Sequence, residues 1–204
     1  MLIVTLLGGC ADIREARVAA SSAPPDFAVD VTILTGSAAK GLPAAHTRQG
    51  KLTLLADGSL HADSGDSIDF ESRTATARSL YREQVEGVWQ LASREGWIDP
   101  ASSDPDVWPG TVMPRRDEIV YLLWFHADGT DWWFVRRCNV TEVPDARVVA
   151  LVRGLCELAW QSDLTADRNL PHRYDFGPNP YAGFAKAPPY TRPATTRPSV
   201  SSNP

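Results

Sequence analysis

Few side chains in this sequence have the types and spacing that catalysis requires. The four histidines are far apart along the chain, and neither Gly-x-Ser-x-Gly nor His-Glu-x-x-His occurs. No glycine-rich phosphate loop is present either. Acid–base chemistry would need His61 or His126 to lie in a cleft beside a carboxylate. The sequence therefore predicts no catalytic residue and no cofactor, and an enzyme is expected only if that arrangement forms.

One acidic stretch, HADSGDSIDFE, begins at His61 and is the best candidate for a metal site. It offers four carboxylates close to the histidine, namely Asp63, Asp66, Asp69 and Glu71. Their spacing does not fit an EF-hand loop. The interpretation that we adopt is an exposed acidic loop after a strand, with no metal bound, and a metal site is the alternative.

The N-terminus carries a motif with a defined chemistry. An apolar run ends in Leu7-Gly8-Gly9-Cys10, which resembles the lipobox of bacterial lipoproteins. In that family the cysteine becomes the new N-terminus and carries acyl chains. The resemblance implies a signal segment over residues 1–10, lipidation of Cys10, the lipid bilayer as a partner, and an extracytoplasmic protein anchored to the cell membrane or outer membrane.

This N-terminal run is shorter than a typical signal and has no Lys or Arg before it. The alternative is a buried N-terminal β-strand, for which several residues are suitable: Leu2, Ile3, Val4 and Leu6. The polar, Ala- and Ser-rich stretch that follows favours a tether over a strand.

If Cys10 is acylated, Cys138 and Cys156 remain as a pair in an oxidising compartment. A helix carrying Cys156 on its flank can approach the end of a strand carrying Cys138, so we predict a disulfide bond. It would contribute about 3 kcal/mol to stability. Reduced cysteines would weaken the case for export.

Composition limits the class of protein. The chain has 204 residues, of which 43% are hydrophobic, enough for one sizeable core. A net charge of -5 argues against a nucleic-acid partner, which would need a basic stripe. No apolar run approaches the roughly 18 residues of a membrane-spanning helix.

The ends of the chain differ from its middle. We expect a flexible tether over 11–25, a single domain over 26–169 and a Pro-, Thr- and Ser-rich extended tail over 170–204. The first half of the tail carries aromatic residues that could pin it to the domain: Tyr174, Phe176, Tyr181 and Phe184.

Periodicity in the middle predicts strands and two helices. Apolar residues alternate from Phe27 to Ile33, and Ala-Asp-Gly turns in KLTLLADGSLHAD and YLLWFHADGTDWWF indicate two β-hairpins. Helical spacing follows each hairpin, in YREQVEGVWQLAS and in PDARVVALVRGLCELAW, where Asp145 can cap the helix. The predicted class is α+β, a mostly antiparallel sheet with two helices on one face in the order β-β-β-α-β-β-α.

The second hairpin is apolar on both faces. Trp132 and Trp133 are neighbours, so they point to opposite sides of a strand, and only one can share the helix-packed core. Trp124, Trp132 and Trp133 are therefore the candidate interaction surface for a glycan, peptide or protein. The interpretation that we favour, however, is that residues 99–116, the tail or a second subunit cover this face, and an exposed interaction surface is the alternative.

The function that these features favour is a membrane-anchored envelope lipoprotein with a non-catalytic binding or structural domain. The alternatives are an enzyme acting on envelope material and a small protease-inhibitor-like module, the latter by analogy of fold alone. The domain resembles no characterised family. A pocket with a histidine and a carboxylate would favour the enzyme, and an aromatic patch would favour binding.

Overall fold

The structure is a computed structural model that describes residues 22–40, 42, 45–104, 108–161 and 179–184. Its six strands form one antiparallel sheet in the order β4-β3-β2-β1-β5-β6. The strands are β1 (Ala28–Thr35), β2 (Gly50–Leu54), β3 (Ser59–Ser64), β4 (Thr76–Ser79), β5 (Glu118–Ala127) and β6 (Thr130–Asn139).

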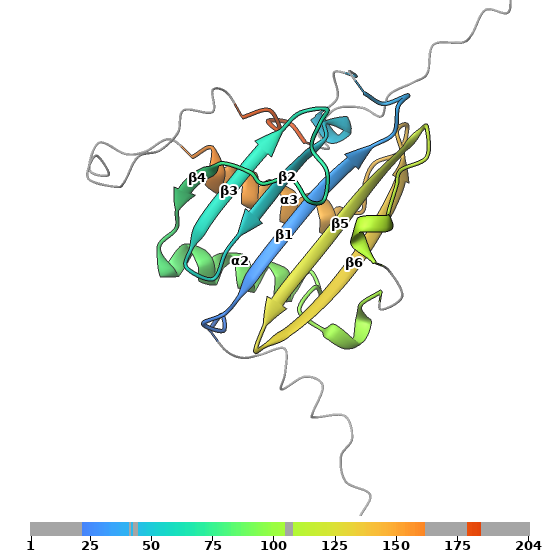
Figure 1. The fold of residues 1–204 in the computed structure, drawn as a ribbon. Coiled ribbons are helices and arrows are strands. Elements are labelled where there is room, and N and C mark those ends of the chain that lie inside the picture. The colour runs from blue at the N-terminus through green and yellow to red at the C-terminus, as the bar shows by residue number, and fades with distance from the viewer. Residues whose placement is uncertain (1–21, 41, 43–44, 105–107, 162–178, 185–204) are drawn as a thin grey trace, which may run out of the picture.

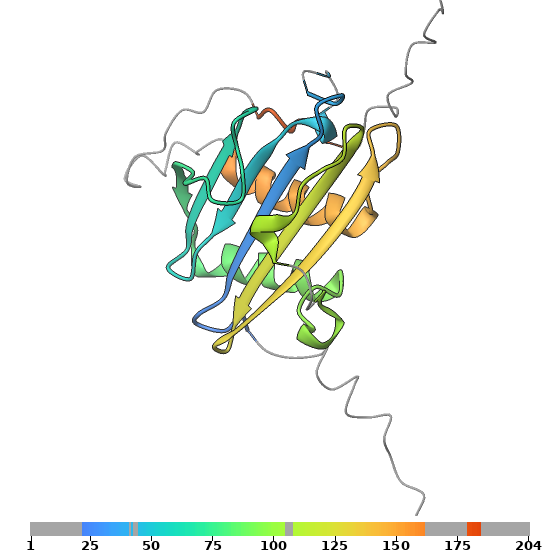
Figure 2. The ribbon, with the colours of Figure 1, turned by 45° about the vertical axis from the view of Figure 1, so that its right-hand side comes forward.

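Two α-helices, α2 (Arg82–Arg94) and α3 (Ala146–Ala159), lie on the same side of the sheet (Figures 1 and 2). Three short 3-10 helices are η1 (Ala45–Thr47), η2 (Pro100–Ser102) and η3 (Pro109–Thr111). The predicted α+β class and its order of strands and helices are confirmed, and the structure adds the short edge strand β4.

Both predicted hairpins form at their Asp-Gly turns. Gly58, between β2 and β3, has a φ of 84°, and the two-residue turn between β5 and β6 has φ values of 51° at Asp128 and 69° at Gly129. Such positive φ angles suit the twist of a tight hairpin and are tolerated best by Gly, Asn and Asp. The turn residues therefore fix the register of the strands that carry the outer face.

The hydrophobic core lies between the sheet and the helices. Val29, Val31 and Ile33 of β1 are completely buried there. The helices contribute the residues that the 3.6-residue period places on one side: Val85, Val88, Trp89, Ala92, Val148, Leu151, Val152 and Leu155. Asp145 caps α3 as predicted, because its Oδ1 accepts a hydrogen bond of 2.8 Å from the backbone N–H of Arg147.

Residues on both sides of the predicted 26–169 domain join this core. Ala23, Tyr181 and Phe184 are each at most 2% exposed. The Tyr181 hydroxyl donates to the backbone oxygen of Gln49 at 3.3 Å, in a space that a Cβ at Gly50 would occupy. Tyr181 and Phe184 thus pin a segment of the predicted tail to the domain, while Tyr174 and Phe176 lie outside the described residues.

The predicted disulfide is absent, because Cys138 and Cys156 are both free thiols. Cys138 interacts with the hydroxyl of Tyr121, whereas Cys156 lies in the electrostatic environment of Tyr181. Phe184 contacts both tyrosine rings at centroid distances of 6.3 Å. Each cysteine therefore packs near a different ring of one aromatic cluster, an arrangement that the spacing of the cysteines in the sequence does not reveal.

Candidate binding site on the outer face of the sheet

The outer face is the side of the sheet turned away from α2 and α3. One row of cross-strand partners crosses it and changes from polar to aromatic, in the order His61, Thr53, Asp30, Trp124 and Trp133. Because side chains alternate between the faces of a strand, all five belong to the same side. The row places a histidine, a carboxylate and two indoles on one surface.

Asp30 is the centre of a hydrogen-bonded network. Its Oδ1 accepts from the Thr32 hydroxyl at 2.8 Å and its Oδ2 from the Thr53 hydroxyl at 2.5 Å, while the Lys51 ammonium lies 3.6 Å from Oδ2. Burial raises the pKa of Asp30 above its ordinary range, although Lys51 and the hydroxyls act to lower it. The network leaves neither carboxylate oxygen without a donor.

The loop between β3 and β4, residues 65–75, crosses this network. Three side chains of the sheet hold its backbone oxygens: Gln49 donates to Ile68, Lys51 donates to Phe70, and Nδ1 of His61 lies 2.9 Å from the oxygen of Thr74. The Lys51 ammonium also lies 5.2 Å from the centre of the Phe70 ring. We call residues 65–75 the outer-face loop.

The sequence predicts an exposed acidic loop here, and the structure corrects this prediction in part. Asp66, Asp69 and Glu71 are exposed, but Ile68 is buried and Phe70 is half-buried against the outer face. Within the described part of the chain, no group of three or more His, Cys, Asp or Glu side chains is placed to hold a metal ion.

A second segment, residues 109–114, includes η3 and covers another part of the outer face. Val112 packs with Leu34, Val120 and Leu122 in a small apolar cluster, separate from the main core. Phe70 packs against the same cluster from the outer-face loop. The predicted cover by residues 99–116 is thus present over part of the face, and the outer-face loop supplies additional cover that was not predicted.

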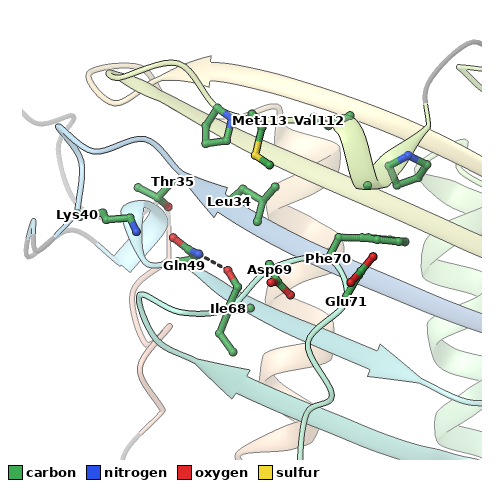
Figure 3. A pocket seen from close by; sticks show the side chains of 13 residues that line it. Leu34, Thr35, Lys40, Gln49, Ile68, Asp69, Phe70, Glu71, Val112 and Met113 are labelled. Atoms are coloured by element: carbon green, nitrogen blue, oxygen red, sulfur yellow. Dashed lines mark hydrogen bonds between the residues drawn. The ribbon is translucent and has the colours of Figure 1, made fainter.

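A pocket of about 430 Å³ lies between these two covering segments (Figure 3). Leu34, Val112 and Phe70 give it apolar walls. Figure 3 shows Lys40 at one end and Glu71 at the other, so the pocket carries opposite charges at its two ends. Its volume is in the range of small-molecule sites in proteins.

The paired tryptophans of β6 separate as the alternation requires. Trp132 lies on the inner face, is 4% exposed and donates from Nε1 to the backbone oxygen of Trp97 at 2.7 Å. It is therefore not part of the candidate interaction surface. Trp133 points outward and is half-buried, with ring-centroid distances of 5.6 Å to Phe70 and 6.0 Å to Trp124.

The exposed parts of Trp124 and Trp133 are next to the covered region. The indole N–H of Trp124 donates to Asp131 at 3.0 Å, which fixes the orientation of its ring. The aromatic surface that the structure supports consists of Trp124, Trp133 and Phe70. Phe70 was missed because the acidic residues around it suggested a solvated loop, although the apolar spacing of Ile68 and Phe70 was a usable signal.

Of the two predicted histidines, His126 lies beside carboxylates, whereas His61 only shares a pocket with one. His61 and Asp30 line a second pocket, of about 340 Å³, on the β2–β3 side of the outer-face loop. His126 lies at the far end of β5, with Nδ1 2.8 Å from Asp131 and Nε2 3.3 Å from Asp26. These carboxylates raise the pKa of His126, chiefly through its hydrogen bond to Asp131.

Neither arrangement pairs a histidine with a carboxylate that is free of other donors, although Nε2 of His61 keeps its lone pair. The Asp30 oxygens accept two hydroxyl protons, and Nδ1 of His61 donates to the Thr74 oxygen, which can only accept. Asp26 accepts the backbone N–H groups of the β5–β6 turn at 2.7 and 2.9 Å, so it has a structural role there.

The lipobox residues, Leu7, Gly8, Gly9 and Cys10, lie outside the described residues. Among the residues that are described, no helix is long and apolar enough to cross a membrane. Comparison with known proteins finds no family model that matches the chain and no curated protein with significant similarity to it.

Proposed function

We propose that this chain is a lipid-anchored protein of the cell envelope whose domain is a non-catalytic binding module. The anchor is Cys10, inferred from its resemblance to a lipobox, and it would attach the protein to the bilayer outside the cytoplasm. The free thiols of Cys138 and Cys156 weaken the case for export. The proposed location therefore depends on residues 7–10.

The pocket of about 430 Å³ is the observation that carries the proposed binding function. It lies over the outer face of the sheet. Two separate segments give it apolar side chains, namely the outer-face loop with Phe70 and the segment that includes η3 with Val112. Carboxylates at its rim and the neighbouring aromatic rings of Phe70 and Trp133 suit a glycan. Sugar hydroxyls donate to carboxylates, and the apolar faces of sugar rings pack on aromatic side chains.

Filling the pocket tests this function. We expect soluble peptidoglycan fragments or neutral oligosaccharides to shift the indole N–H resonance of Trp133 and the methyl resonances of Leu34 in a saturable way. Val112→Trp places an indole in the pocket and should abolish the shifts. Val143→Trp is the matched control, because Val143 is 60% exposed and does not line the pocket.

Two results would contradict the proposal: no saturable shift with any glycan, or equal binding by the Val112→Trp and Val143→Trp proteins. Saturable shifts with a protein partner instead of a glycan would retain the binding module and reject the ligand class.

The enzyme alternative has one observation in its favour, the shared pocket of His61 and Asp30. Both oxygens of Asp30 already accept hydrogen bonds from hydroxyl groups, which argues against it. A His61→Gln protein that loses hydrolysis of an envelope polymer, while it keeps its fold and glycan binding, would restore that alternative. Within the described residues, no structural feature specifically favours the protease-inhibitor alternative.

A further inference from the structure

The second pocket, of about 340 Å³, has a composition different from that of the first. Its floor is the Asp30 network with Lys51 and Thr53, and its rim is formed by His61 and by residues 72–74 of the outer-face loop. Leu55, which is 38% exposed, adds an apolar contact. Ligand binding in this pocket would be independent of lipidation and of glycan binding in the first pocket.

The charge of the pocket is opposite in sign to that of the chain. The whole protein has a net charge of -5, but the only acidic residue among those lining this pocket is Asp30. Lys51 and Arg73 both carry positive charge there. The pocket is therefore positive by one charge when His61 is neutral, and by two when it is protonated.

The negative charge of Asp30 is already compensated. Thr32 and Thr53 donate to its two oxygens and Lys51 lies 3.6 Å away, all on a residue that is 6% exposed. Asp63, the cross-strand partner of Lys51, does not line the pocket and receives a hydrogen bond from the backbone of Ser64. Neither Asp30 nor Asp63 therefore neutralises the guanidinium of Arg73, which also lines the pocket.

Arg73 provides the donors that face a ligand. Its side chain is exposed, and no hydrogen bond or ion pair joins its guanidinium to the described residues. A guanidinium has five N–H donors in a planar fork that matches the two oxygens of a carboxylate or phosphate. Lys51 also lines the pocket, where it is 9% exposed, paired with Asp30 and held by the Phe70 oxygen.

The tautomer of His61 adds a third group. Because Nδ1 donates to the backbone oxygen of Thr74, Nε2 is the nitrogen that can gain a proton and become a further donor. Thr74 also lines the pocket. The pocket thus combines the guanidinium of Arg73, the ion pair of Lys51 with Asp30 and the ring of His61.

We propose that this pocket binds the oxyanion group, carboxylate or phosphate, of a small organic molecule. Arg73, whose charge no carboxylate of the pocket lining compensates, would hold the oxyanion by two parallel hydrogen bonds, and Leu55 would contact the apolar part of the ligand. The volume of the pocket corresponds to a molecule at the small end of the usual ligand range.

Titrations of the full chain with sodium acetate and with sodium phosphate test this proposal. Amide resonances of residues 51–55, 61 and 72–74 should shift in a saturable way at constant ionic strength, with sodium chloride as the non-oxyanion control. A response to acetate alone identifies a carboxylate ligand, a response to phosphate alone identifies a phosphate ligand, and both outcomes support the site.

Substitution of Arg73 shows whether the pocket itself is responsible. We expect Arg73→Gln to weaken anion binding by about five-fold or more, because it removes the charged donors. Arg94→Gln is the matched control, since Arg94 is an exposed arginine of α2 whose side chain is 70% accessible. Arg73 is exposed, so its substitution should leave the fold intact.

The proposal is overturned if neither anion gives a saturable shift, if chloride reproduces the shifts, or if the Arg73→Gln and Arg94→Gln proteins bind equally well. Shifts confined to Leu34 and Val112 would place anion binding in the first pocket and would also reject this site. None of these results decides whether the first pocket binds a glycan, because that claim is tested with Val112→Trp.

Discussion

Asp30 and Lys51 form an ion pair on the sheet face away from the main core, yet both residues are more than nine-tenths buried. The outer-face loop covers them, and Lys51 also bonds to that loop through the Phe70 oxygen. Removal of one partner from a buried ion pair leaves the other charge without compensation, which is strongly destabilising. The pair therefore connects the stability of the sheet to the position of the loop.

We predict that Asp30→Ala lowers the free energy of unfolding by about 3–5 kcal/mol, because it leaves the Lys51 ammonium buried without its carboxylate. The double variant Asp30→Leu with Lys51→Met should be clearly more stable than the single variant. Urea denaturation measures both effects. Glu157→Gln, at a side chain that is 72% exposed, is the control and should change little. A single variant as stable as the control would contradict this account of the network.

The two thiols allow a prediction about reactivity. Burial raises the pKa of Cys138 to about 11 and raises that of Cys156 as well, so neither forms a thiolate at neutral pH. We expect both to resist a thiol reagent in the folded protein and to react promptly after unfolding in guanidinium. Fast labelling of either thiol in the native protein, or an intact mass that shows a disulfide, would refute the arrangement described here.

At the scale of elements, the outer-face loop is held by side-chain donors from β2 and β3 and by the Phe70 ring. We expect Phe70→Ala to reduce stability by about 1–2 kcal/mol, since Phe70 is only half-buried. It should also increase proteolytic cleavage within residues 65–75. Leu55→Ala, an exposed residue near the same strands, is the control. An unchanged cleavage pattern would mean that the aromatic contact does not hold the loop.

The β5–β6 hairpin should have a pH-dependent contact with the segment before β1. Both ring nitrogens of His126 face carboxylate oxygens, so the protonated ring is favoured and the pKa is raised. The stabilising contribution is fully present below the unfolded pKa of about 6.5 and is lost as the pH rises through the higher folded pKa. Asp26 remains ionised in this range because N–H groups of the turn lower its pKa.

We therefore predict that His126→Gln is more destabilising at about pH 5.5 than at about pH 8.5, as measured by urea denaturation. The comparison must be made as a difference from the unaltered protein, because burial lowers the pKa of His46 and gives it the opposite pH dependence. An equal effect of the substitution at both pH values would show that the ring is not charged in this contact.

At the scale of the whole molecule, periodicity was sufficient to predict the layers but not the cover of the outer face. The alternation around Val29 and the Asp-Gly turns specified the sheet, and the helical spacing in α2 and α3 specified the face on which they pack. These signals are local, so they can be identified from a single sequence.

The candidate site depended on long-range contacts that no local signal contains. The bond from Lys51 to Phe70 joins residues 19 positions apart, and the pocket also needs Val112 from a third segment. In the sequence alone, Asp30 and Thr32 are only the polar positions of the alternation from Phe27 to Ile33. The disulfide prediction was wrong for the same reason, because it relied on the order of elements without the packing of Tyr121 and Tyr181 around the cysteines.

Lipid anchoring is the claim on which the proposed location of the whole molecule depends. The most direct test is intact mass spectrometry of the full-length protein, expressed from its native upstream sequence and recovered from fractionated cells, with Cys10→Ser as the control. We predict a membrane-bound protein that begins at an acylated Cys10 and a Cys10→Ser protein that is neither acylated nor cleaved. A soluble protein that retains residues 1–9 and carries a free Cys10 thiol would contradict the account.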